Sequence, residues 1–153
     1  MQYRIAKQAD YRQMANLYWN YTEEENDMSD IAEEAFTARF YAFLEMYLGV
    51  DYVCWVAEEA GQIVSVVYIG ILEKMPVPSG ERVRIGYVAN VYTLPAFRHR
   101  KIAAELMDVV QDWARTHDFE MLFVLPGEKS VPFFERQAFT DDNAIMEYAF
   151  RTK

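Results

Sequence analysis

Several features that mark common protein classes are scarce in this chain of 153 residues. Its one cysteine, Cys54, excludes an internal disulfide framework, and a cytoplasmic location is therefore the expectation. No apolar run approaches the roughly 20 residues of a membrane helix, and the first ten residues lack the apolar core of a secretory signal. The sequence therefore predicts no membrane partner. Two isolated histidines, His99 and His117, form no ligand cluster, so the sequence predicts no metal.

Basic residues are also in short supply. Lysine and arginine number 15 against 24 aspartate and glutamate residues, which gives a formal net charge of −9. Seven of the 24 acidic residues, and no basic one, fall between Glu23 and Glu34, which leaves 17 acidic residues against 15 basic ones elsewhere. Such a balance is poorly suited to neutralising a phosphate backbone, and we expect no nucleic-acid partner.

The chain is rich in apolar residues, which recur with helical spacing in some segments and in strand-like runs in others. Hydrophobic residues make up 52% of it, which suits a single globular domain over residues 1–153. Helical spacing follows Asp10, recurs between Asp30 and Gly49, and returns at 99–117 and 130–137. Strands are predicted at 3–6, 52–57, 63–72, 83–93 and 121–125, with two short strands within 139–150. A strand, helix and strand over 83–125 imply a right-handed crossover between parallel neighbours, and hence a mixed α+β sheet.

The densest basic cluster, FRHRKIA at 97–103, lies where the strand 83–93 passes into a helix. The first amides of a helix have no partners within the helix, and its dipole adds a partial positive charge there. A helix start is therefore a natural anion site, and a diphosphate would fit it. A solvated surface patch is the other interpretation that composition allows.

At this point the sequence resembles a known family. NVYTLPAFRHRKIAAELM, together with the downstream KSVPFFERQAF, is similar to the acetyl-CoA-binding core of the GNAT N-acetyltransferases. The family signature Arg/Gln-x-x-Gly-x-Gly/Ala stands here as residues 98–103, and the order of elements matches over essentially the whole chain. The resemblance implies a mostly antiparallel sheet of about six or seven strands, splayed at its centre and flanked by about four helices.

The resemblance also implies where acetyl-CoA, as co-substrate, would bind. The backbone of Asn90, Val91 and Tyr92 would pair with the pantetheine arm and the acetyl group, as an added strand does. The pyrophosphate would be held by the amides and side chains of the signature, namely Arg98, His99, Arg100, Lys101, Ile102 and Ala103.

Three residues depart from the family pattern. Lys101 takes the place of a glycine, and we expect it to be tolerated because a helical backbone would not require glycine there. Phe134 stands where many members have a tyrosine that protonates the leaving thiolate, and Gly127 replaces a frequent asparagine. The catalytic residues are therefore not identified, with Tyr92, Ser130 or water as candidate proton donors.

The acceptor would enter past the first two helices. Carboxylates of the acidic segment 23–34 would concentrate cationic amines, and Trp19, Tyr21 and Glu24 are the candidate acceptor-binding residues. A solvated loop and a helix start also explain the same acidic residues.

The sequence therefore predicts an N-acetyltransferase that moves an acetyl group from acetyl-CoA to a primary amine of a small cationic molecule by direct attack. A protein lysine or N-terminus is an alternative acceptor, and a non-catalytic acyl-CoA sensor is an alternative function. The acceptor, the preferred acyl chain and the oligomeric state, with a homodimer among the options, stay open.

Overall fold

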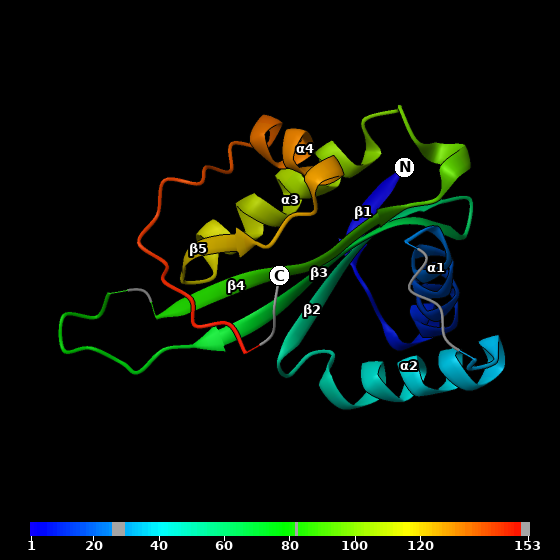
Figure 1. Ribbon diagram of the computed structural model, residues 1–153, viewed down its shortest axis with the longest axis horizontal. Helices are drawn as coiled ribbons and strands as arrows, with labels where there is room; N and C mark the ends of the chain where they lie inside the picture. The colour runs from blue at the N-terminus through cyan, green and yellow to red at the C-terminus, as the bar shows by residue number, and fades with distance from the viewer. Residues whose placement is uncertain (26–29, 82, 151–153) are drawn as a thin grey trace.

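The computed structural model describes residues 1–25, 30–81 and 83–150, which form one five-stranded sheet with helices on both faces (Figure 1). The strands lie side by side in chain order. Neighbours from β1 to β4 are antiparallel, and β4 and β5 are parallel, which confirms the predicted mixed α+β class. The strand bounds are β1 Gln2–Ile5, β2 Tyr52–Glu59, β3 Gln62–Glu73, β4 Arg84–Thr93 and β5 Phe119–Val124.

Four α-helices cover the sheet in the described part of the chain, as expected. Figure 1 shows α1 and α2 on one side of it and α3 and α4 on the other. Their bounds are α1 Tyr11–Glu24, α2 Glu33–Tyr47, α3 Ile102–Thr116 and α4 Val131–Arg136. None of the described helices is long and apolar enough to cross a membrane.

The core lies in two layers, one on each face of β3. Every residue from Ile63 to Gly70 is buried, as a strand covered on both faces requires. Val67 and Ile69 pack with the apolar stripe of α3, while Val66 and Tyr68 pack with α1 and α2. The long β-branched run that predicted this strand therefore has its cause in two-sided burial.

The C-terminal segment corrects the sequence prediction. No strand forms within the described part of residues 139–150, so the sheet has five strands instead of six or seven. The apolar side chains that the sequence predicts in strands there are largely exposed. Met146 and Phe150 are each 95% exposed. A strand needs a neighbour to satisfy its backbone, and the register of this segment with β5 is not set by its own alternation.

We expect Gly86→Val to lower the free energy of unfolding by about 1–3 kcal/mol, because it overpacks the contact between β4 and β5. A Cβ atom at Gly86 would lie 2.4 Å from Leu122 Cδ2 and 3.1 Å from Ile69 Cγ2. Urea denaturation measures the change. The matched control is Gly127→Ala, whose Cβ would meet nothing within 4 Å. Equal stabilities for the two variants would contradict the close approach of the strands.

Candidate functional site

Strand β4 changes its facing halfway along. Asn90 pairs with Tyr68, but the next pair is Val88 with Ile69, so Ala89 is an extra, bulged residue. A bulge places two successive side chains on the same side of the sheet. Ala89 and Asn90 accordingly both face α1 and α2. A regular strand over 83–93 would put Ala89 and Val91 on one face, but the bulge places them on opposite faces.

Beyond the bulge, β4 also parts from β5. The parallel ladder ends at the pair Val88 and Val124, whereas β4 continues to Thr93. Backbone groups of Asn90, Val91 and Tyr92 therefore lie past the end of the β5 pairing. This arrangement leaves the β5 side of the strand able to pair with an extended ligand.

The connection from β4 to α3 corrects the prediction for the signature. The helix begins at Ile102, not at residue 99, and Lys101 just before it has φ 62° and ψ 16°. His99 is also left-handed, with φ 63°. Lys101 thus has the left-handed conformation that favours glycine. The expectation that its backbone is helical and does not require glycine is therefore wrong.

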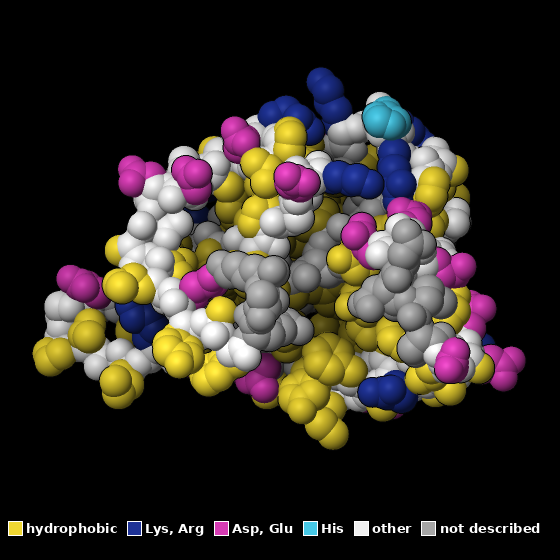
Figure 2. All heavy atoms as spheres, viewed as in Figure 1, with side chains coloured by type: hydrophobic (Ala, Val, Ile, Leu, Met, Phe, Trp, Pro, Cys, Tyr) yellow, Lys and Arg dark blue, Asp and Glu magenta, His cyan; other side chains and the backbone are white. Residues whose placement is uncertain are grey.

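The same connection places basic side chains beside the start of α3. Arg98, His99, Arg100 and Lys101 are all exposed. Figure 2 shows lysine and arginine side chains gathered at this edge of the molecule, over the β4–α3 connection of Figure 1. Arg100 lies 3.3 Å from a carboxylate oxygen of Glu59 and packs over the Phe97 ring.

Arg98 joins this connection to the end of α1. Its guanidinium donates to Glu24 Oε2 at 2.7 Å and to the carbonyl of Thr93 at 2.9 Å, and it lies over the Tyr92 ring. Glu24 Oε1 accepts a hydrogen bond from the Tyr92 hydroxyl at 2.6 Å. Glu24, Tyr92 and Arg98, which the sequence assigned to three separate roles, therefore form one hydrogen-bonded group.

Each carboxyl and hydroxyl of this group is shifted by its partners. Burial alone would raise the pKa of Glu24, but the hydrogen bonds from Tyr92 and Arg98 outweigh it and lower that pKa. Burial, followed by the hydrogen bond to Glu24 and its charge, raises the pKa of Tyr92. Tyr92 is thus a protonated hydroxyl that already donates a hydrogen bond to the Glu24 carboxylate.

A pocket of about 350 Å³ lies between the two N-terminal helices and the bulge, and we call it the aromatic pocket. Its walls are mostly rings, with Tyr18 and Phe40 stacked at 4.4 Å between centroids. Arg39 is the one charged residue in its described lining. The lining residues are Tyr18, Phe36, Arg39, Phe40, Phe43, Tyr52, Tyr68, Ala89 and Asn90.

Two polar atoms of the aromatic pocket's lining residues have no oxygen or nitrogen hydrogen-bond partner among the described residues. They are the hydroxyl oxygen of Tyr68 and Oδ1 of Asn90, both buried. The Cys54 thiol lies within hydrogen-bonding reach of the Tyr68 hydroxyl. Burial, with the charges of Cys54 and Tyr18, raises the pKa of Tyr68 well above its ordinary value. Buried polar atoms in this state are unusual, because desolvation without a partner is costly.

The acceptor candidates from the sequence lie beside this pocket and not in its lining. Trp19 is buried against Phe36, and Tyr21 meets the edge of the Tyr92 ring. Of the acidic segment, Asp27 lies outside the described residues. Aromatic residues at helical spacing, as in 36–47, are typical of a core, and no local signal indicates that Tyr68 and Asn90 close a pocket with them.

The second candidate proton donor, Ser130, is held locally at the start of α4. Its hydroxyl donates to the carbonyl of Gly127 at 2.9 Å. Phe134, one turn further on, is buried in the core layer of α3.

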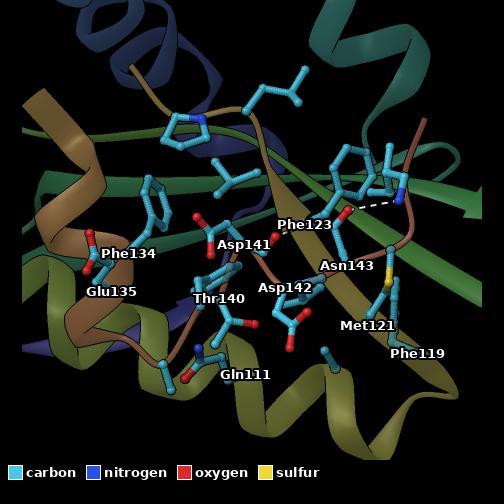
Figure 3. A pocket seen from close by; sticks show the side chains of 18 of the residues that line it. Gln111, Phe119, Met121, Phe123, Phe134, Glu135, Thr140, Asp141, Asp142 and Asn143 are labelled. Carbon is cyan, nitrogen blue, oxygen red and sulfur yellow. Dashed lines mark hydrogen bonds between the residues drawn. The ribbon is translucent and has the colours of Figure 1, made fainter. Parts of the chain in front are cut away.

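A larger hollow of about 1120 Å³ lies elsewhere, along the outer edge of β5 (Figure 3). Figure 3 shows it bounded by Phe134 and Glu135 of α4, Met121 and Phe123 of β5, and the segment around Asp141. None of the residues predicted to bind cofactor or acceptor is among its described lining residues. This hollow marks the space next to β5 that the predicted C-terminal strands would have filled.

Comparison with known proteins identifies the fold. The model of the acetyltransferase (GNAT) family matches residues 11–139. A predicted acetyltransferase from Clostridium acetobutylicum, solved with acetyl-CoA, is 23% identical over 97% of this chain and 95% of that one, with a TM-score of 0.74. No curated protein matches the chain.

Two other solved structures are similar over nearly their whole length. A ribosomal-protein-alanine N-acetyltransferase from Brucella melitensis biovar Abortus is 19% identical over 98% of this chain and 100% of that one, with a TM-score of 0.72. A glucosamine-6-phosphate N-acetyltransferase from Arabidopsis thaliana is also 19% identical, over 98% of each chain, with a TM-score of 0.69. At these identities the structures share the fold.

We expect Lys101→Gly to raise the free energy of unfolding by about 1 kcal/mol, because it relieves a side chain in the left-handed region. Urea denaturation measures it. The matched control is Lys7→Gly, an exposed lysine whose φ of −126° suits any residue, and that change should be neutral or slightly destabilising. A Lys101→Gly protein less stable than wild type would contradict the strain.

Proposed function

Because the chain belongs to the GNAT acetyltransferase family, we propose that it transfers the acetyl group of acetyl-CoA to a primary amine of a small molecule. The observation that carries the proposal is the parting of β4 from β5 beyond Val88 and Val124, directly before the basic start of α3. An extended arm and a diphosphate need these two features side by side.

In this proposal the co-substrate is held mostly by backbone. The pantetheine arm pairs with Asn90, Val91 and Tyr92, and the pyrophosphate lies on the first amides of α3. Arg100 and Lys101 add positive charge at the same place. Arg98 contributes differently, because its guanidinium is bound to Glu24 and fixes the connection in place.

The proposed reaction is direct attack. The amine nitrogen bonds to the thioester carbonyl carbon, a β4 amide near Val91 or Tyr92 stabilises the oxyanion, and the carbon–sulfur bond then breaks. The amine loses a proton to water, and the departing thiolate gains one. A thiolate is a tolerable leaving group, since thiol pKa values lie near 8.5, so positioning can supply much of the rate.

Tyr92→Phe should lower kcat by less than about tenfold, because the raised pKa of Tyr92 and its bond to Glu24 make it a poor proton donor. Steady-state kinetics with saturating acetyl-CoA measures the effect. The matched control is Tyr87→Phe, on the same strand and stacked on Phe123. A loss of about a thousandfold for Tyr92→Phe alone would identify a discrete acid and contradict this mechanism.

Two measurements test the function itself. CoA at about 100 times its dissociation constant should stabilise the folded protein by about 2.7 kcal/mol, seen as a rise in Tm. Acetyl-CoA with an amine panel should release free thiol and an acetylated amine. A Tm shift without thiol release from any amine, including peptide amines, would favour the non-catalytic sensor, and the absence of any shift would exclude a CoA site.

The remaining expectations depend on this proposal. A protein lysine or N-terminus is the second acceptor class, and peptide amines in the same panel decide between the two. The acidic segment 23–34 is the reason to expect a small cationic acceptor. Within that segment, Glu24 already binds Tyr92 and Arg98, so its charge is partly neutralised. A cytoplasmic location and a homodimer stay predictions.

A further inference from the structure

The geometry points to the aromatic pocket as the acceptor site, and to an acceptor of one class: a compact primary amine with an aromatic or otherwise apolar body and no second positive charge. This inference rests on the proposed function, because it names the substrate of the same site. It departs from the small cationic acceptor that the acidic segment 23–34 favours.

The position of the pocket follows from the bulge in β4. Ala89 and Asn90 line it, and Asn90 begins the stretch proposed to pair with the pantetheine arm. An acetyl group held along Asn90 to Tyr92 therefore lies next to the pocket opening. An amine in the pocket would reach the thioester from the α1 and α2 side of the sheet.

The Asn90 Oδ1 atom and the Tyr68 hydroxyl, which lack an oxygen or nitrogen partner, supply the polar contacts that an amine needs. Asn90 Oδ1 is an acceptor for one N–H of the amine. Tyr68 is the residue of β3 that pairs with Asn90, and its hydroxyl can accept a second N–H or donate to the nitrogen. A ligand with one amine would satisfy both atoms and remove their desolvation cost.

The aromatic walls also address the missing base. Ring surfaces around an ammonium replace its hydration, and this desolvation lowers the pKa of an amine. A larger fraction of a single bound amine is then neutral and nucleophilic without a dedicated carboxylate.

Charge and size narrow the class further. Arg39 is the one charge in the described lining, is exposed on α2, and repels a second cation while attracting a carboxylate. The volume of about 350 Å³ lies near the lower end of ligand pockets, which extend from about 300 to 1,000 Å³. This volume favours a single-ring amine over a multi-ring amino sugar.

The first test compares amines of matched reactivity by thiol release: 2-phenylethylamine, 4-(2-aminoethyl)benzoate and spermidine. We expect kcat/KM at least about tenfold higher for the two aromatic amines than for spermidine. Arg39→Glu should lower kcat/KM for the benzoate about tenfold and raise it for spermidine, because the rim charge reverses. Arg12→Glu, an exposed charge reversal on α1 outside the pocket lining, should change neither.

The second test uses Tyr68→Phe. Removing a buried hydroxyl that has no oxygen or nitrogen partner should leave stability unchanged or raise it in urea, while kcat/KM for 2-phenylethylamine falls about tenfold. A purely structural role would lower stability and activity together. An unchanged kcat/KM would overturn the assignment of Tyr68 to the acceptor.

Outcomes for the two proposals are distinguishable. Turnover of spermidine or peptide amines in preference to aromatic amines, unaffected by Arg39→Glu, would overturn the inference and leave the acetyltransferase intact. Release of thiol from no amine at all would overturn the proposed function, and the inference with it.

Discussion

The structure depends on the hydrogen-bonding of one strand. β4 pairs with β3 over its whole length but with β5 only up to Val88, and the bulge at Ala89 lies at that point. A strand whose second edge is released in the middle of a sheet must present unpaired backbone groups there. The bulge turns Asn90 toward one face while the release opens the edge of the strand. A backbone site and a side-chain pocket thus meet at a single residue.

Around this point, polar contacts connect segments that are distant in sequence. Arg98 and Glu24 are 74 positions apart, and their ion pair ties the end of α1 to the connection that precedes α3. Both side chains are more than a third exposed, so the pair adds little stability and its value is in orientation. Its position links the side of the sheet that would receive the acceptor with the loop that would hold the phosphates.

Much of the fold could be predicted from local pattern, and the failures have identifiable causes. The two-sided burial of β3 and the amphipathic stripe of α3 produce strong periodic signals, so both elements were predicted, although α3 begins at Ile102 and not at residue 99. The bulge at Ala89 leaves no such signal, because it depends on which residue of β3 lies opposite. The segment 139–150 alternates like a strand, yet a strand exists only where a partner fixes its register.

The site divides in the same way. The signature at 98–103 was found because its chemistry is local, a helix start with added positive charge. The left-handed conformation of Lys101 was not predicted, because a lysine does not indicate that conformation in a sequence as a glycine does. The aromatic pocket was missed because stacked rings at helical spacing are normally core. Its distinguishing feature is a pair of buried atoms on two strands, which no single segment contains.

The burial of Cys54 has a consequence for an enzyme that would release a free thiol at every turnover. Cys54 is the only cysteine of the chain, it is fully buried, and burial raises the pKa of its thiol. Disulfide exchange requires an accessible thiolate. The folded protein therefore offers oxidised coenzyme A nothing to react with, and it cannot be trapped as a mixed disulfide with its own product. Because Cys54 is buried, a chromogenic disulfide reagent would react with the released CoA thiol and not with the folded protein.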